Sequence, residues 1–280
     1  MSTWILLRGL TREGGHWGAF LNLLQRRSMQ SRILALDLPG NGTRYGLRSP
    51  ASIEAMTQWC RDHVRSQGIP PPYHLLAMSM GGMVAVDWAA RSPDEIAGCV
   101  LINTSLRPLS PWYRRLRPGN YGALIALALA PGFDAWHERT ILRLTGRDPA
   151  GSSATLGEWV HLRRTRPVSA PNALRQLLAA ARYLAAATAP PVPLLVLTSR
   201  HDRLVDWRCS QELARHWRTD FGVHPTAGHD LTLDAGAWVA DQVARWATTR
   251  TSHWPRSPVT APHAPGPRRS RAPPEGRRLG

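Results

Sequence analysis

The stretch AMSMGG, residues 77–82, places one serine and two glycines between two apolar runs. The run at 75–78 has the length of a buried strand, and the run at 83–88 continues as an apolar helical pattern. A strand that passes into a helix through a very short turn explains this pattern, because such a turn can hold a serine hydroxyl clear of the backbone. The stretch therefore predicts a strand, a tight turn and a helix, with Ser79 displayed at the turn.

Strand and helix patterns alternate along the chain on both sides of this turn. Strands are predicted at 4–7, 33–38, 74–78, 97–103, 194–198 and 220–224, and helices at 16–27, 52–66, 82–91, 209–217 and 235–247. The strand runs are mostly continuous rather than alternating, which is typical of strands that helices cover on both faces. The predicted fold class is therefore α/β, with a doubly wound, mostly parallel sheet.

The alternation stops between residues 104 and 190, where helical patterns replace strands. Helices are predicted there at 120–130, 133–144 and 173–187. The last of these carries an apolar face formed by Leu174, Leu177, Leu178 and Ala181. We therefore expect an α/β core made of residues 1–103 and 191–250, with residues 104–190 inserted as a helical cap.

The composition is that of a globular protein with an unusual basic bias. Of its 280 residues 43% are hydrophobic and 19% charged, and the formal net charge is +16. Such a charge ordinarily suggests nucleic acid or an anionic membrane as a partner. However, all 35 basic residues are arginines, and the Pro- and Arg-rich segment from residue 248 onward contributes +6 of the charge. We expect residues 251–280 to be a disordered tail, and no specific nucleic-acid partner.

The cysteines and the apolar runs bear on where the protein resides. Cys60, Cys99 and Cys209 lie far apart, without the spacing of a zinc site or a disulfide framework. The first residues lack the pattern of a signal peptide, and the longest apolar run, at 123–130, is much shorter than the roughly 20 residues of a membrane helix. We expect a soluble, cytoplasmic protein that does not bind membranes.

Two further polar residues follow predicted strands in the way that Ser79 does. Asp202 lies in TSRHDRLVD (198–206), and His229 lies in PTAGHD (225–230). Because parallel strands end at the same edge of a sheet, the three residues can converge there. A serine becomes an effective nucleophile when a histidine takes its proton and a carboxylate orients that histidine. Ser79, Asp202 and His229 are therefore a candidate catalytic triad.

Each member of this triad has a simpler interpretation or a competitor. A serine beside glycines is by itself usually a turn residue, so the hypothesis depends on the three residues together. Asp206 and Asp37 are the competing acids. The other histidines of these segments, which we expect at the surface or in loops, are His16, His201 and His224. His16 and Trp17 could also line the mouth of a pocket, although Trp17 fits an ordinary core position equally well.

With its order of serine, aspartate and histidine, the chain resembles the α/β-hydrolase superfamily, whose serine lies in a G-x-S-x-G turn. LLRGLTREGGHW (6–17) resembles the first strand and oxyanion loop of that family, and DLPGNG (37–42) resembles its D-x-P-G-x-G segment. The resemblance covers residues 3 to about 247. It implies Ser79 as nucleophile, Asp202 as acid and His229 as base, with no metal or organic cofactor. It also implies the backbone N–H groups of Leu10 and Met80 as oxyanion-hole donors.

The chain departs from the family pattern at two positions. Ala77 replaces the first glycine of the serine turn, which is a small change because alanine is the next smallest residue. Arg8 replaces the histidine of the oxyanion segment. Since the oxyanion donors are backbone groups, we expect Arg8 to leave the hole intact and to alter its rim.

The resemblance implies a serine hydrolase that cleaves a small carboxylic ester or thioester through an acyl-enzyme intermediate. The same triad also serves amide hydrolysis, carbon–carbon bond cleavage, perhydrolysis and lyase chemistry in this fold. The alternative from another class is a catalytically silent protein that binds an anionic partner through Arg8, the tail and a cluster of cap residues. That cluster consists of Trp112, Tyr113, Arg114, Arg115 and Arg117.

Overall fold

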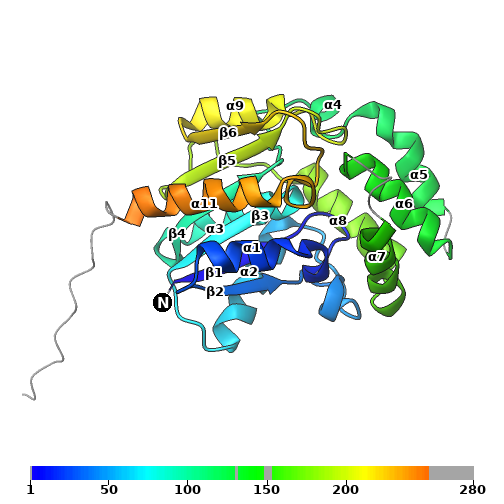
Figure 1. Cartoon of the computed structure of the whole chain (residues 1–280), viewed down its shortest axis with the longest axis horizontal. Helices are drawn as coiled ribbons and strands as arrows, with labels where there is room; N and C mark the ends of the chain where they lie inside the picture. The colour runs from blue at the N-terminus through cyan, green and yellow to red at the C-terminus, as the bar shows by residue number, and fades with distance from the viewer. Residues whose placement is uncertain (1, 130–131, 148–152, 252–280) are drawn as a thin grey trace, which may run out of the picture.

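The computed structural model describes residues 2–129, 132–147 and 153–251. Six parallel strands form one sheet in the order β2-β1-β3-β4-β5-β6 (Figure 1). The strands are β1 (Thr3–Leu7), β2 (Arg32–Leu36), β3 (Tyr73–Met78), β4 (Ile96–Ile102), β5 (Leu194–Ser199) and β6 (Asp220–His224). From β1 the chain first moves to β2 and then returns to β3 on the other side, so the sheet is doubly wound. All six predicted strands are present, and the predicted fold class is confirmed.

Helices cover both faces of the sheet. On one face lie α2 (Ile53–Ser66), α3 (Met80–Arg91) and α9 (Arg208–Trp217), and on the other lie α1 (Phe20–Arg27) and α11 (Gly236–Thr251). Along β1, Ile5 and Leu7 join the core under the first face, and Trp4 and Leu6 join the core under the second. A strand that contributes side chains to two cores has no polar face, and for this reason apolar and polar residues do not alternate in its sequence.

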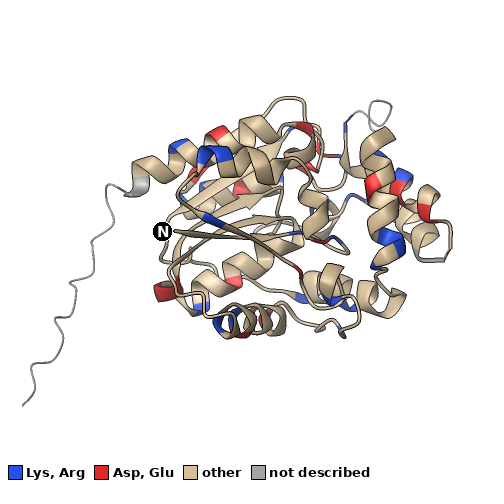
Figure 2. Ribbon diagram, turned by 60° about the horizontal axis from the view of Figure 1, so that its bottom comes forward, with Lys and Arg blue, Asp and Glu red and all other residues tan. Residues whose placement is uncertain are grey.

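Formal charges are nearly absent from the sheet. Among the residues of the six strands only Arg32 and Asp220 are charged, and each is the first residue of an edge strand, β2 or β6. Figure 2 shows the remaining charges on helices and loops around a sheet that is almost free of them. Since an unpaired charge is costly to bury, this distribution leaves the centre of the sheet to apolar side chains.

Local sequence signals account for where two of the helices begin. The Ser52 hydroxyl accepts a hydrogen bond from the Ala55 N–H (3.2 Å), so Ser52 is the predicted N-cap of α2. The helix predicted at 16–27 is instead two pieces, a 3₁₀ turn η1 (Gly14–Trp17) and α1. Gly18, at a φ of 47°, separates them, because this conformation ends a helical run and suits glycine.

The last helix is longer than the sequence predicts. α11 continues to Thr251, so residues 248–251 are helical although the Pro- and Arg-rich composition begins at 248. The disordered tail expected at residues 251–280 is therefore wrong for Thr251, and residues 252–280 lie outside the described part of the chain. Within that part, no helix has both the length and the apolar character needed to cross a membrane.

The cap helices all lie between β4 and β5. They are α4 (Trp112–Arg115), α5 (Tyr121–Leu129), α6 (Asp134–Thr145), α7 (Ser153–Thr165) and α8 (Ala170–Arg182), and they gather beyond one end of the sheet (Figure 1). The predicted helix at 120–130 matches α5, except that residue 130 lies outside the described residues. Helix α7 is not predicted from the sequence, because it buries little besides Trp159 and has no apolar stripe.

The orientation of α8 contradicts the apolar face predicted for it. Leu174 and Leu177 are exposed, at 57% and 41%, whereas Asn172 and Gln176 face inward and are buried. The helix also ends at Arg182, five residues before the predicted end. Polar contacts of the inward-facing amides, described below, oppose the usual preference for burying leucine.

Gly81 allows α3 to pack directly on the end of β1. A Cβ atom at this position would lie 2.5 Å from the Leu7 carbonyl oxygen and 2.7 Å from that of Arg8. Because backbone cannot move aside as a flexible side chain can, we predict that Gly81→Ala lowers the free energy of unfolding by about 1–3 kcal/mol. Urea denaturation followed by circular dichroism measures this loss.

Gly157→Ala provides the matched control, because Gly157 lies in α7 with open space around its Cβ position. The substitution is expected to raise stability by up to about 1 kcal/mol through helix propensity. Equal effects of the two substitutions would contradict the close approach of α3 to β1.

Candidate active site

Ser79 is the only residue between β3 and α3. It has a φ of 54° and a ψ of −121°, a conformation that is uncommon for residues other than glycine. Its N–H donates to the Ile102 carbonyl (2.9 Å), and its carbonyl accepts from the Thr104 hydroxyl (2.8 Å). These two bonds to the end of β4 and the segment after it hold the strained turn at the carboxyl edge of the sheet.

The loop that follows β1 lies directly against Ser79. A Cβ atom on Gly9 would be 3.0 Å from the Ser79 Cβ and 3.5 Å from its Oγ. The next residue is Leu10, and among the described residues neither its N–H nor that of Met80, the first residue of α3, has a hydrogen-bond acceptor. Met80 follows Ser79 directly in sequence, and Leu10 adjoins Gly9, which lies against Ser79 in space, so both predicted oxyanion donors belong to segments next to Ser79.

His229 and Asp202 form a buried pair. The Nδ1 atom of His229 lies 2.7 Å from Oδ2 of Asp202, and both side chains are less than a tenth exposed. The other oxygen of Asp202 accepts from the N–H groups of Leu204 and Val205, each at 2.8 Å. These backbone donors fix the carboxylate, and the carboxylate in turn fixes the imidazole ring with Nε2 on its far side.

The competing acids have other partners. Asp206 accepts from the Arg208 N–H (3.0 Å) at the start of α9. Asp37 accepts from the N–H groups of Gly14 (2.6 Å) and Thr43 (2.8 Å), which makes it a structural residue of its loop. Of the three candidate acids, Asp202 is the one that contacts His229.

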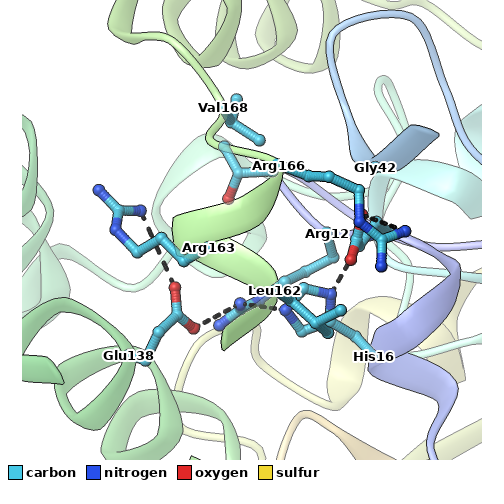
Figure 3. Close-up of a pocket in the computed structure, with 10 residues that line it drawn as sticks. Arg12, His16, Gly42, Glu138, Leu162, Arg163, Arg166 and Val168 are labelled. Carbon is cyan, nitrogen blue, oxygen red and sulfur yellow. Dashed lines mark hydrogen bonds and ion pairs between the residues drawn. The ribbon is translucent and has the colours of Figure 1, made fainter. Parts of the chain in front are cut away.

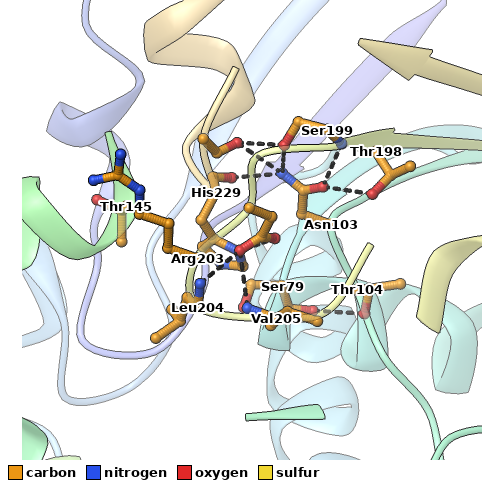
Figure 4. A network of polar contacts seen from close by, with 12 residues as sticks. Ser79, Asn103, Thr104, Thr145, Thr198, Ser199, Arg203, Leu204, Val205 and His229 are labelled. Atoms are coloured by element: carbon orange, nitrogen blue, oxygen red, sulfur yellow. Dashed lines mark hydrogen bonds and ion pairs between the residues drawn. The ribbon is translucent and has the colours of Figure 1, made fainter. Parts of the chain in front are cut away.

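Asn103 joins the segments that carry the acid and the base (Figure 4). Its Oδ1 accepts from the Thr198 hydroxyl (2.9 Å) and the Ser199 N–H (3.1 Å) at the end of β5, and its Nδ2 donates to the His229 carbonyl (2.7 Å). The Ser199 hydroxyl also donates to the Gly228 carbonyl. Asn103 is not among the residues predicted from the sequence, although its position directly after β4 matches that of Ser79 after β3.

Arg8 is buried and does not form a rim, contrary to the expectation from sequence. Its Nη2 donates to Asp230, the neighbour of His229, at 2.5 Å, and its guanidinium lies 4.8 Å from the centre of the Trp17 ring. Burial would raise the pKa of Asp230, but the charge and hydrogen bonds of Arg8 outweigh it and lower that pKa. The Asp230 N–H donates to the Thr145 carbonyl at the end of α6 (2.8 Å). The segment of His229 and Asp230 is thus bound both to Arg8, directly after β1, and to the cap.

A second polar cluster joins the cap to the loop after β1 (Figure 3). Arg12 donates to Glu138 of α6 at 2.6 Å and lies 2.7 Å from the His16 ring. Burial lowers the pKa of His16, and the charge of Arg12 adds to this effect. His16 is therefore a buried residue of the interface with the cap, which contradicts its expected place at the surface or in a loop.

Of the charged side chains in this cluster, Glu13 has the weakest pairing with an opposite charge. Its side chain is 4% exposed, and its nearest cation, Arg166 of the segment after α7, lies 3.5 Å away. Burial raises the pKa of Glu13 to about 7, against the opposing charge of Arg166. The residues around it enclose a cavity of about 20 Å³, which is room for one water molecule.

The remaining candidates are not part of the buried pair. His201 is exposed, and the ring of His224 accepts from the Ala227 N–H (3.0 Å). Trp17 is a core residue, in agreement with the simpler of its two interpretations.

A parallel sheet with a strained serine turn and a buried histidine–aspartate pair at its carboxyl edge defines a hydrolase of the α/β class. Residues 4–242 match the family described as "Alpha/beta hydrolase family", and the chain belongs to that family. The structure is similar to that of a thermophilic esterase from Thermogutta terrifontis, with a TM-score of 0.68 and 22% identity over 89% of this chain and 90% of that chain. It is also similar to the enol-lactonase from Burkholderia xenovorans, with a TM-score of 0.69 and 20% identity over 88% and 91%.

Two relatives are similar over most of their sequence. The pimeloyl-[acyl-carrier protein] methyl ester esterase of Methylococcus capsulatus is 28% identical over 238 residues, which are 75% of this chain and 80% of the relative. A protein of Variovorax paradoxus named carbamate hydrolase RutD is 31% identical over 250 residues, which are 83% and 86%.

The raised pKa of Glu13 predicts a specific dependence of stability on pH. Between pH 4.5 and about 7 the unfolded chain releases a proton that folded Glu13 retains, so the folded state loses stability as the pH rises through this range. We predict that Glu13→Gln removes this loss, which amounts to about 3 kcal/mol at 1.36 kcal/mol per pKa unit.

Urea denaturation of both proteins from pH 5 to pH 8 tests this prediction. The variant should gain stability over the wild type as the pH rises, whereas Glu158→Gln, the same change at an exposed position of α7, should run parallel to the wild type. A difference in the free energy of unfolding between Glu13→Gln and the wild type that stays constant from pH 5 to pH 8 would contradict the raised pKa of Glu13.

Proposed function

We propose that the protein is a serine hydrolase that cleaves a small carboxylic ester or thioester through an acyl-enzyme intermediate. The observation that carries this proposal is the buried pair of His229 and Asp202, at the sheet edge where the strained turn displays Ser79. A histidine held in this way can accept a proton at Nε2, because the carboxylate stabilises the imidazolium that results.

In the proposed reaction the Ser79 oxygen attacks the acyl carbonyl while His229 takes the hydroxyl proton. The carbonyl oxygen becomes an oxyanion that accepts hydrogen bonds from the N–H groups of Leu10 and Met80. Collapse of this intermediate leaves the acyl group on Ser79, and His229 returns the proton to the departing alcohol or thiol. Water, activated by the same histidine, then releases the acid and restores the serine.

The names of the relatives support an acyl substrate. The Methylococcus protein is named for a methyl ester and the Variovorax protein for a carbamate. Hydrolysis of either group requires a nucleophile to attack a carbonyl carbon. An ester or thioester is the simplest substrate that the proposed residues can turn over, since its leaving group needs little assistance. The buried, unpaired cysteines Cys60, Cys99 and Cys209 support a cytoplasmic location.

The alternative of a silent protein that binds an anionic partner has less support. Arg8, one of the residues proposed to contact such a partner, is buried and paired with Asp230. The network of Asn103 and the backbone donors to Asp202 would have no purpose in a surface-binding protein, because they order groups that do not reach the surface.

Single substitutions in the triad test the proposal. We predict that Ser79→Ala and His229→Ala each lower kcat for p-nitrophenyl acetate and butyrate by at least about 10³-fold, because each removes a group that acts in bond making. Asp202→Asn should cost about as much, since the amide would favour the wrong tautomer of His229. Turnover and labelling by a fluorophosphonate probe measure the effects.

His201→Ala is the control, because this exposed histidine adjoins Asp202 without taking part in the pair, and it should retain wild-type turnover. Labelling of the Ser79→Ala protein at the wild-type rate would exclude Ser79 as the nucleophile. For the wild type, a panel of acyl esters and thioesters of graded chain length then identifies the preferred acyl group.

A further inference from the structure

Helix α8 of the cap buries two side-chain amides and exposes two of its three leucines. Gln176 has no exposed surface and Asn172 is nearly buried, whereas Leu174 and Leu177 point outward. Burying an amide is unfavourable unless its polar atoms find partners, and exposing leucine forgoes hydrophobic stabilisation. The contacts of the buried amides therefore determine how this helix faces the core.

Gln176 is bonded through both ends of its amide. Its Oε1 accepts from the Thr11 N–H (2.8 Å), and its Nε2 donates to Oδ1 of Asn41 (2.7 Å) and to the Ser49 hydroxyl (3.0 Å). Asn41 in turn donates from Nδ2 to the Arg12 carbonyl (2.9 Å). The two amides thus hold the loop after β1 on both sides of the peptide that joins Thr11 to Arg12.

The held segment has a conformation that needs support. Thr11 has a φ of 57°, and the left-handed region is strongly disfavoured for a β-branched residue. Such a conformation persists when surrounding contacts impose it. The Arg12 N–H closes the turn onto the Gly9 carbonyl (3.2 Å), so residues 9–12 form one compact unit that Gln176 and Asn41 restrain.

Leu10 lies inside this unit. Its N–H is the proposed oxyanion donor, and Gly9 on its other side lies against Ser79. The Thr11 N–H belongs to the peptide group that follows Leu10, so fixing this N–H restricts the rotation that would turn the Leu10 N–H away from the oxyanion. In a serine protease, removing a single oxyanion-hole donor lowers kcat about 10²–10³-fold. An N–H group that points away from the oxyanion is a lost donor in the same sense, so the direction of the Leu10 N–H matters.

We propose that Gln176 is a positioning residue that holds the oxyanion loop, residues 9–12, in its productive conformation. This inference rests on the proposed function, because it assigns Gln176 a role through the Leu10 N–H. It also connects the cap to the reaction. Gln176 belongs to α8 and Thr11 to the oxyanion loop, so the hydrogen bond between them makes this connection.

Gln176→Met tests the inference, because methionine has nearly the same volume and makes none of the three hydrogen bonds. We expect kcat for p-nitrophenyl acetate to fall about 10–100-fold with KM changed less than about 3-fold. The affinity for an aryl trifluoromethyl ketone should fall by a similar factor, because the ketone binds by adding the serine oxygen to form an oxyanion in the same hole.

Asn172→Leu is the matched control. Asn172 lies one turn before Gln176 on the same buried face, but it bonds to the Leu47 carbonyl and the Ser49 N–H instead of the oxyanion loop. This variant should lose a comparable amount of thermal stability while kcat and ketone affinity stay within about 3-fold of the wild type. Equal losses of kcat in the two variants at equal Tm would overturn the inference.

A second variant keeps the test decisive if Gln176→Met does not fold. Gln176→Glu retains an acceptor for the Thr11 N–H and loses the two donated bonds, so we expect a kcat between those of the wild type and Gln176→Met, and about 3–10-fold below the wild type. If both variants fold, a wild-type kcat in Gln176→Glu together with unaltered ketone affinity in Gln176→Met would overturn the inference. If Gln176→Met does not fold, a wild-type kcat and unaltered ketone affinity in Gln176→Glu would overturn it. Failure of the proposed function would differ, because the wild type would then show neither turnover nor fluorophosphonate labelling.

Discussion

Two backbone segments meet at Ser79 with no side chain between them, and the arrangement of the site depends on this close approach. Gly81 lets the first turn of α3 pack on the last residues of β1, and Gly9 lets the following loop reach Ser79. An ordinary side chain at either position would push the loop and the serine turn apart. At Gly81 this approach is backbone on backbone, and at Gly9 the loop backbone lies against the Ser79 side chain, so close packing places the loop that carries Leu10 next to the nucleophile.

Buried polar groups then orient the loops that this packing brings together. Asn103 binds the segment of His229, Arg8 binds the neighbouring Asp230, and Gln176 binds Thr11. Each of these contacts joins parts of the chain that are far apart in sequence. Buried polar contacts add little net stability, but a displaced loop would leave donors and acceptors without partners, and this penalty favours a single geometry. The exposed leucines of α8 show that the geometry takes precedence over maximal burial of apolar surface.

The sheet and the serine turn could be anticipated because they depend on local patterns, and the pairing of Asp202 with His229 could be anticipated from their places after strands and from the resemblance to the α/β-hydrolase superfamily. Continuous apolar runs mark strands that are buried on both faces, and polar residues just after such strands gather at one edge. Helix α7 was missed because it lacks an apolar stripe, and the faces of α8 were assigned wrongly because its leucines follow a helical period. His16 and Arg8 were expected outside the core, since sequence alone does not show that Glu138 and Asp230 compensate Arg12 and Arg8.

The order of strands and helices, the turn at Ser79 and the three candidate catalytic residues were all predicted without the structure. The strands, helices and turn follow from hydrophobic period and glycine spacing, which are local, whereas Asp202 was preferred to Asp206 and Asp37 through the resemblance to the α/β-hydrolase superfamily. Only the tertiary structure decided that Asn103, Arg8 and Gln176 hold the loops around Ser79, and that α8 turns its amides inward. The physical reason is that a hydrogen bond between distant segments leaves no periodic signal in either segment, so its partners become visible when the chain is folded.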